Sequence, residues 1–221
     1  IWTAMQLSSR LPKGALFHMG VSNTRRCWNM FQLPESVESA CNVGCCGIDG
    51  CVSTLVGASL VNPDRLCYVV VGDLTFFYDL NSLGNHHIGT NLRVMLVNNG
   101  RGTEFRLGIH HCNVFGDDAD KYMAAAGHFG NKSPLLVKHY AEDLGFHYLS
   151  ATTKEEFMTA LSNFTNPQLS DHSMILEVFT DSKDESEALY LMSHIQSDAK
   201  GMVRSKLKDA VRNVAGEKGI N

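Results

Sequence analysis

The sequence lacks an apolar run long enough to cross a membrane. Its longest apolar block, residues 66–71, has the length of a strand, whereas a spanning helix needs about 18 or more apolar residues. Positive charge is also scarce, because 19 Lys and Arg stand against 23 Asp and Glu, for a formal net charge of −4. This balance argues against a nucleic-acid-binding protein and against a polybasic membrane-surface protein. We therefore expect neither a nucleic acid nor a membrane as partner.

Cysteine motifs are equally sparse. The seven Cys are an odd number, and no two of them form a C-x-x-C pair. In a chain of 221 residues they have neither the density of a disulfide scaffold nor the spacing of an iron–sulfur site, so we expect free thiols and a cytoplasmic location. The chain begins with Ile1 rather than Met and has no signal-like segment, which favours a piece cut from a longer chain.

Strand-like and helix-like segments alternate along the chain. Residues 66–71 and 92–97 have no polar face, which is typical of strands buried between two layers of helices. The pattern predicts one α/β domain over residues 1–195, a three-layer doubly wound parallel sheet, followed by a C-terminal helical tail over residues 196–221. The expected strands are 15–20, 66–71, 92–97, 146–149 and 173–179, and the expected helices are 22–30 with Ser22 as N-cap, 51–60, 76–83, 120–126, 134–144, 154–164 and 199–216.

Polar residues that could bind a metal diphosphate follow the two buried strands. Gly72 and Asp73 follow the first strand, and Asn99 follows the second. Ligands of doubly wound sheets bind beyond the carboxyl ends of the strands, so both loops lie at the binding edge. Gly72 permits a tight turn, and Thr75 with the free N–H groups of the next helix can hold a phosphate. The Asp73 carboxylate, the Asn99 amide oxygen, a main-chain carbonyl and diphosphate oxygens would together form an octahedral Mg²⁺ site.

The spacing of 26 residues from Asp73 to Asn99 resembles the thiamine-diphosphate (ThDP) motif, in which Gly-Asp is followed by Asn-Asn. Leu74 stands where the motif usually has a further Gly, and some branches of the family carry Leu there. Over residues 1–195 the chain resembles the C-terminal diphosphate-binding domain of 2-succinyl-5-enolpyruvyl-6-hydroxy-3-cyclohexene-1-carboxylate synthase, the ThDP enzyme of menaquinone biosynthesis. The matching segments are 22–26 (SNTRR), 47–54 (GIDGCVST), 72–81 (GDLTFFYDLN) and 97–105 (VNNGRGTEF).

This resemblance implies the ThDP-binding fold, with ThDP and Mg²⁺ as cofactors. Asp73 and Asn99 would bind the metal through their side chains, and Arg101 would bind it through its main-chain carbonyl. Ile48 would be the apolar residue that bends the cofactor. The other cofactor contacts that the resemblance implies are Cys45, Cys46, Gly72, Leu74, Thr75, Gly102 and Thr103.

The resemblance also implies a substrate pocket. Ser22 and Arg26 would face a substrate carboxylate, for which an Arg fork is well suited, and Glu104 and Phe105 would line the same pocket. Two positions depart from the synthase pattern, because Val43 replaces a second substrate-binding Arg and Glu104 replaces an apolar residue. Losing a cation and gaining an anion disfavours the two acidic substrates of that synthase, 2-oxoglutarate and isochorismate. Another 2-oxo acid is therefore about equally well supported as substrate.

No catalytic side chain is expected in this chain. In the resembled enzymes the Glu that activates ThDP lies on a separate pyrimidine-binding domain, so the expected partner is that domain, in the same or a partner chain of a dimer or tetramer. Two functions stay open. The first is the cofactor domain of a ThDP-dependent decarboxylase or carboligase, inactive in isolation. The second is a stand-alone diphosphate-binding subunit of a heteromeric 2-oxo acid decarboxylase, or a non-catalytic ThDP-binding module.

The paired histidines do not have the spacing of a zinc site. His86 and His87 are adjacent and cannot both bind a metal from one helix face, and His110-His111-Cys112 lacks a partner pair at finger-like spacing, so we expect structural roles for both groups. His110 or His111 could instead line the substrate pocket, because the loop after Asn99 lies near the expected cofactor site.

Overall fold

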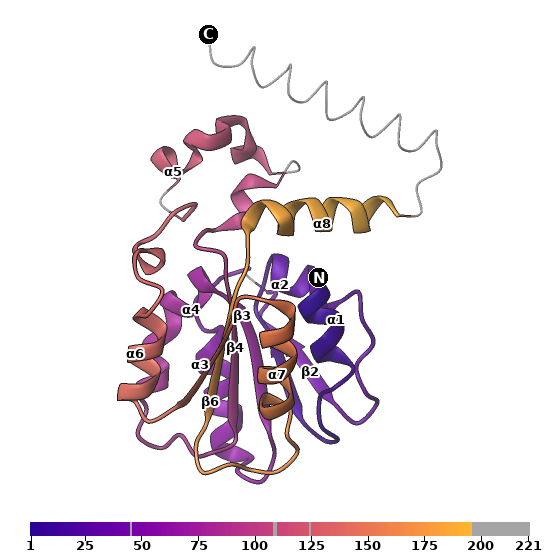
Figure 1. Ribbon diagram of the computed structural model, residues 1–221, viewed down its shortest axis with the longest axis vertical. Coiled ribbons are helices and arrows are strands. Elements are labelled where there is room, and N and C mark those ends of the chain that lie inside the picture. Colours follow the sequence, from indigo (N-terminus) through magenta and orange to yellow (C-terminus); the bar gives the residue numbers. More distant parts are fainter. Residues whose placement is uncertain (45, 108–109, 124, 196–221) are drawn as a thin grey trace.

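A computed structural model describes residues 1–195 apart from 45, 108–109 and 124. It contains one six-stranded sheet, in which every neighbouring pair of strands is parallel and the order is β2-β1-β3-β4-β6-β5 (Figure 1). The predicted doubly wound α/β fold is therefore confirmed. The strands are β1 (Leu16–Met19), β2 (Glu38–Cys41), β3 (Cys67–Gly72), β4 (Leu92–Asn98), β5 (His147–Ala151) and β6 (Met174–Phe179).

Helices cover both faces of this sheet and connect its strands. The α-helices are α1 (Trp2–Ser8), α2 (Asn23–Trp28), α3 (Cys51–Val61), α4 (Asp73–Asp79), α5 (Ala119–Tyr122), α6 (Leu136–Asp143), α7 (Lys154–Phe164) and α8 (Ser182–His194). The 3₁₀ segments are η1 (Leu80–Gly84), η2 (Thr103–Arg106), η3 (His111–Asp118) and η4 (Phe129–Lys132). No helix in the described part of the chain has both the length and the apolar character needed to cross a membrane.

The apolar core consists of two layers, one on each face of the sheet. Alternate residues of β3 divide between them: Tyr68 and Val70 belong to the layer with α1, α2 and α7, and Val69 and Val71 belong to the layer with α3, α4 and α6. Because successive side chains of a strand point to opposite faces, a strand buried on both faces is mostly apolar; the buried polar exceptions include Arg93 on β4 and Glu177 on β6. This explains why the central strands show no polar alternation.

Several elements differ from the sequence expectation. Helix α4 begins at Asp73 instead of 76 and is followed by η1, and α5 ends at Tyr122 instead of 126. Among the described α-helices and strands, α1, β2 and α8 were not predicted, and neither were the 3₁₀ segments η2, η3 and η4. Strand β2 is an edge strand with three exposed residues and one partly buried residue, so it has no apolar run to reveal it. The expected helix over 199–216 lies outside the described residues.

Helix α8 lies across one end of the sheet (Figure 1). It follows β6 directly after a two-residue connection, so it lies at the end where the parallel strands finish. Buried Leu189 joins α8 to the same core layer as α1 and α7. This helix therefore lies at the edge of the sheet where ligands of doubly wound folds bind.

Candidate functional site

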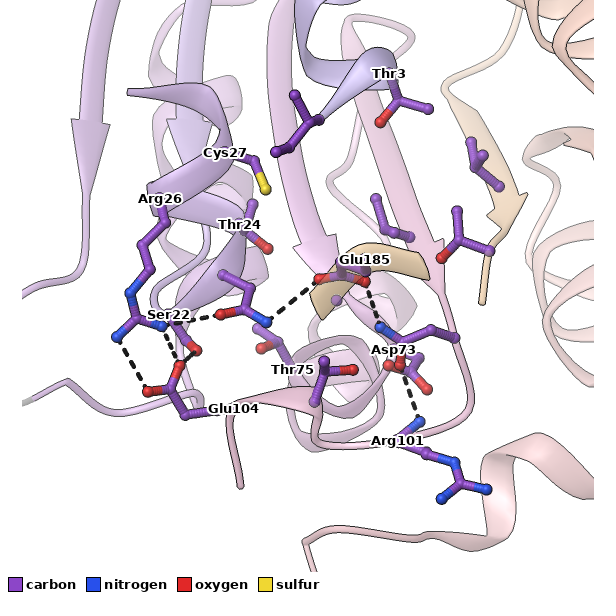
Figure 2. A pocket seen from close by; sticks show the side chains of 18 of the residues that line it. Thr3, Ser22, Thr24, Arg26, Cys27, Asp73, Thr75, Arg101, Glu104 and Glu185 are labelled. Atoms are coloured by element: carbon purple, nitrogen blue, oxygen red, sulfur yellow. Dashed lines mark hydrogen bonds and ion pairs between the residues drawn. The ribbon is translucent and has the colours of Figure 1, made fainter. Parts of the chain in front are cut away.

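A cavity of about 900 Å³ lies at the carboxyl ends of strands β1, β3, β4 and β6. Its lining includes Ser22 after β1, Asp73 after β3, Asn99 after β4 and Asp181 after β6. From β1 the chain leads outward to β2 on one side and returns to β3 on the other, so the strand order reverses between β1 and β3. A crevice at such a reversal is the usual ligand site of this fold class. Figure 2 shows side chains from these separate elements around a common space.

The cavity brings together nearly all the residues that the sequence indicated. Cys45 lies outside the described residues. Neither His110 nor His111 is among the described residues that line the cavity; the His110 ring instead packs edge-on against Phe105, with centroids 5.1 Å apart. Val43 also lies at the cavity. The predicted site residues that line the cavity are Ser22, Arg26, Cys46, Ile48, Gly72, Asp73, Leu74, Thr75, Asn99, Arg101, Gly102, Thr103, Glu104 and Phe105.

Asp73 is the first residue of α4 and its side chain is almost fully buried. Only 1% of the residue is exposed, and its carboxylate Oδ2 lies 2.7 Å from Nε2 of His128. His128 precedes η4, 55 residues further along the chain, and was not indicated by the sequence. The Asp73 carboxylate is thus held at the carboxyl end of β3 by a contact with a residue that is distant in the sequence.

Asn99 is held by two hydrogen bonds. Its Nδ2 donates to Glu185 Oε2 at 2.7 Å, and its Oδ1 accepts from the main-chain N–H of Arg101 at 3.1 Å. Glu185 belongs to α8 and also accepts from Asn23 Nδ2 at 3.4 Å (Figure 2). Burial raises the pKa of the Glu185 carboxyl, and the hydrogen bonds from the two Asn side chains oppose that rise. Glu185 is a site residue that the sequence did not indicate.

Asn98, the residue before Asn99, stabilises the turn that follows β4. Its Oδ1 accepts from the N–H of Gly100 at 3.1 Å, and its Nδ2 donates to Glu177 Oε1 at 2.7 Å. Glu177 is buried on β6, and its other oxygen accepts from the Tyr148 hydroxyl at 2.7 Å. Gly100 has a φ of +73°, a conformation that glycine adopts at no steric cost. A buried polar network therefore sets the shape of the loop that carries Asn99.

Arg26 pairs with Glu104 instead of standing free in the cavity. Arg26 Nη2 donates to Glu104 Oε1 at 3.0 Å, and both Arg26 Nη1 and the Ser22 hydroxyl donate to Glu104 Oε2. The hydrogen bond to Glu104 raises the pKa of Arg26. Burial alone would raise the pKa of Glu104, but the hydrogen bonds from Arg26 and Ser22 outweigh burial and lower it. Both side chains of the pair are therefore charged at neutral pH.

Ser22 occupies the N-cap position of α2, as predicted, but its side chain does not cap the helix. Its φ of 66° and ψ of −132° are unusual for a residue other than Gly, and its hydroxyl donates to Glu104. Strained backbone of this kind occurs preferentially at binding and catalytic sites. The strain at Ser22 thus coincides with the polar end of the cavity.

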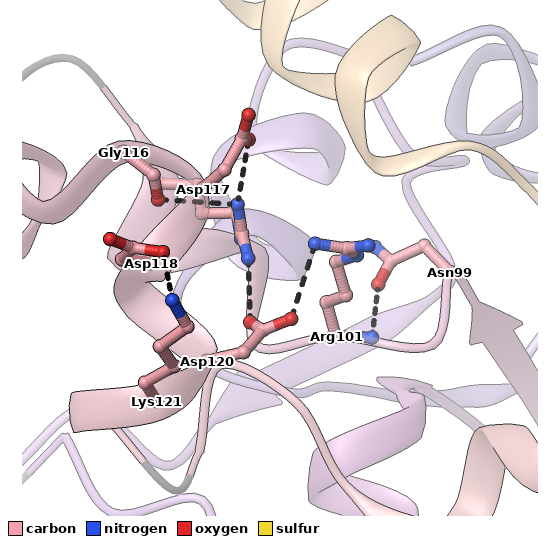
Figure 3. Close-up of polar contacts among 8 residues, drawn as sticks. Asn99, Arg101, Gly116, Asp117, Asp118, Asp120 and Lys121 are labelled. Carbon is pink, nitrogen blue, oxygen red and sulfur yellow. Dashed lines mark hydrogen bonds and ion pairs between the residues drawn. The ribbon is translucent and has the colours of Figure 1, made fainter.

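The Arg101 side chain points toward an ionic cluster formed by residues of η2, η3 and α5 (Figure 3). Its Nη1 lies 3.5 Å from Asp120 Oδ2, and Arg106 Nη2 lies 2.6 Å from Asp120 Oδ1. Arg106 also donates to the carbonyl of Gly116 at 3.4 Å. The side chain of Arg101 is thus paired with Asp120, and its main-chain carbonyl is the group through which the resemblance implies metal binding.

The donor groups at this edge of the cavity fit a magnesium diphosphate. Asp73 and Asn99 offer one carboxylate and one amide oxygen, and hard oxygen donors in small number suit Mg²⁺ when phosphates supply the remaining ligands. Within the described part of the chain, no group of three or more His, Cys, Asp or Glu side chains could hold a metal ion. The oxygen donors of Asp73 and Asn99 fit a metal that is bound together with its phosphate ligand.

Comparisons with known proteins agree with the motifs. No family model matches the chain. The 2-succinyl-5-enolpyruvyl-6-hydroxy-3-cyclohexene-1-carboxylate synthase of Bacteroides fragilis is 34% identical over 183 residues, which cover 83% of this chain and 31% of that synthase. The synthase of the same name from Phocaeicola vulgatus is 34% identical over 187 residues (83% and 31%), and that from Christiangramia forsetii is 35% identical over 187 residues (84% and 30%).

The chain thus spans about 30% of the length of the curated relatives that it matches. The resemblance seen in the four sequence segments is confirmed by these relatives. The chain is homologous, over that part of their length, to the 2-succinyl-5-enolpyruvyl-6-hydroxy-3-cyclohexene-1-carboxylate synthases, which are ThDP-dependent enzymes.

Proposed function

We propose that this chain is the ThDP- and Mg²⁺-binding part of a 2-oxo acid decarboxylase or carboligase related to the menaquinone-pathway synthase. The observation that carries the proposal is the position of Asp73 and Asn99. They follow the adjacent parallel strands β3 and β4, whose register pairs Gly72 with Val97, and both line one cavity. Homology to the synthases supports the same conclusion.

The roles proposed for the site residues follow from their positions. Asp73 and Asn99 bind Mg²⁺ through their side chains, Arg101 binds it through its carbonyl, and Ile48 contacts the cofactor with its apolar side chain. Bound ThDP supplies the electron sink for decarboxylation of a 2-oxo acid, and the residues of this chain bind, orient and enclose it. The remaining cofactor contacts that we propose are Cys46, Gly72, Leu74, Thr75, Gly102 and Thr103, which line the cavity, and Cys45, which lies outside the described residues and is proposed from the resemblance alone.

We further propose that the activating Glu comes from a pyrimidine-binding domain of the same or a partner chain, in a cytoplasmic dimer or tetramer. Residues 1–195 would form the diphosphate-binding domain and 196–221 a helical tail. On this account residues 1–221 in isolation bind ThDP weakly and do not turn over a 2-oxo acid. The alternative is a separate diphosphate-binding subunit of a heteromeric decarboxylase, or a non-catalytic ThDP-binding module.

Calorimetry with ThDP, in the presence and absence of Mg²⁺, tests the proposal on the protein at its natural length. We expect binding that requires Mg²⁺ and, with bound cofactor, release of CO₂ from a 2-oxo acid. Absence of Mg²⁺-dependent binding would contradict the proposed function. Micromolar affinity together with decarboxylation by residues 1–221 alone would contradict the need for a pyrimidine domain.

A further inference from the structure

The guanidinium of Arg26 already holds a carboxylate of its own chain. Two of its nitrogens donate to the two oxygens of Glu104, and the Ser22 hydroxyl donates to one of them (Figure 2). This two-point arrangement is the one that an Arg fork makes with a carboxylate ligand. Glu104 lies on η2. Arg26 lies on α2, and Ser22 directly precedes that helix. The Arg26–Glu104 pair therefore joins two separate elements that border the cavity.

The rest of the cavity offers limited support for another negative charge. Among the described lining residues, five carry a carboxylate and four carry a cationic side chain. Two of those cations are engaged, since Arg26 pairs with Glu104 and Arg101 with Asp120. The lining also includes the apolar side chains of Val43 and Phe105. A neutral group suits these surroundings better than a second carboxylate.

We propose that Glu104 fills the carboxylate position made by Ser22 and Arg26, so that the protein selects 2-oxo acids whose distal end is uncharged. This inference rests on the proposed function and names the class of substrate within it. With Glu104 in this position, a 2-oxo acid with an aliphatic distal end can bind beside the pair without breaking it, whereas a 2-oxo acid with a second carboxylate cannot.

The cost to a dicarboxylate substrate follows from the geometry. To reach Arg26, its second carboxylate must displace Glu104 and leave that partly buried anion without its two donors. Removing the partner of such a charge is strongly destabilising, because a partly buried ion is left unpaired. If it binds beside Glu104 instead, two like charges are brought together. Either route lowers affinity for the dicarboxylate relative to its uncharged counterpart.

The test compares 2-oxopentanoate with 2-oxoglutarate, which have the same chain length and differ in a terminal methyl or carboxylate. For each acid, kcat/KM is measured with ThDP and Mg²⁺, and the Kd is measured by calorimetry without ThDP, on the protein at its natural length. The wild-type protein should prefer 2-oxopentanoate. Glu104→Leu should shift both preference ratios toward 2-oxoglutarate by about tenfold or more, the scale of one charge-assisted hydrogen-bonded pair.

Two further variants separate this specificity role from general damage. Glu104→Gln keeps the size of the side chain and removes its charge, so it should shift the ratios in the same direction by less. Adding Arg26→Gln to Glu104→Leu should reverse the shift, because the freed cation is then absent. A wild-type preference for 2-oxoglutarate, or a ratio that Glu104→Leu leaves unchanged, would overturn the inference. If neither acid bound or reacted with any variant, the proposed function would fail and this inference with it.

Discussion

The Asn99 side-chain amide donates to the Glu185 carboxylate across 2.7 Å, which joins the loop after β4 to helix α8. The two residues are 86 positions apart in the chain. Glu185 accepts a further hydrogen bond from Asn23, the first residue of α2. One carboxylate on α8 therefore ties together two of the segments that line the cavity.

Glu185→Ala should lower the free energy of unfolding by about 1–3 kcal/mol, because it leaves the amides of Asn99 and Asn23 without their acceptor. Urea denaturation measures the difference. Glu187→Ala, on the exposed side of the same helix, is the matched control and should change stability by about 0.5 kcal/mol or less. Equal losses in the two variants would mean that the contact to Asn99 does not stabilise the fold.

Gly102→Ala should destabilise the cavity loop. A Cβ at this position would overlap the carbonyl oxygen of Ala125 and would lie 3.0 Å from the Phe105 ring. Backbone cannot yield as a flexible side chain does, so we expect a loss of about 1–3 kcal/mol in unfolding free energy. Thermal and urea unfolding measure it.

The control is Gly57→Ala, in the interior of α3, where a Cβ would meet no atom within 4 Å. Replacing a glycine inside a helix by alanine should stabilise the protein by about 0.5–1 kcal/mol. If Gly102→Ala were neutral or stabilising, that result would contradict the close contact between Gly102 and the main chain of Ala125.

Because the Glu177 carboxyl is buried, we expect the effect of its substitution on stability to depend on pH. Burial raises its pKa above the ordinary value of 4.5, against the opposing hydrogen bonds from Asn98 and Tyr148. The folded state therefore holds this proton more tightly than the unfolded chain. The resulting stabilisation is fully present below the unfolded-state pKa and is lost as the pH rises through the raised, folded-state pKa.

Glu177→Gln has a similar size and no charge, so it lacks this pH dependence. The stability of the variant relative to wild type should therefore increase as the pH rises from about 4 to about 8. Urea unfolding of both proteins at several pH values in this range gives the difference. A difference that stays constant over the whole range would contradict the raised pKa of Glu177.

The sequence predicts the elements whose signals are local. Helix α7 has the predicted bounds, because Thr153 and Glu156 form a capping box before an amphipathic segment. Strands β3 and β4 were predicted to within one residue at each end, because their apolar runs are continuous. Strand β2 was missed because an exposed edge strand needs no apolar pattern, and α8 was missed because it has only one buried residue, Leu189.

The residues of the site also divide into those with a local sequence signal and those without one. Gly72 ends a recognisable strand, and Asp73 and Asn99 follow recognisable strands, so their common location could be predicted from topology. Glu185 contacts Asn99 from 86 positions away, and His128 contacts Asp73 from 55 positions away. No motif in the adjacent sequence identifies either residue. The pairing of Arg26 with Glu104 spans 78 positions. The sequence therefore indicated which side chains share the cavity but not how they pair within it.

The central claim is that Asp73 is a ligand of a magnesium diphosphate, and ThDP binding by Asp73→Ala tests it most directly. The measurement is calorimetric titration of ThDP with saturating Mg²⁺ into wild type and the variant at natural length, with circular dichroism to show that both are folded. We predict Mg²⁺-dependent binding by wild type and its loss, by about a hundredfold or more in Kd, in Asp73→Ala, because the Mg²⁺ site loses its only side-chain carboxylate ligand. Unchanged Mg²⁺-dependent affinity in a folded Asp73→Ala protein would contradict the claim.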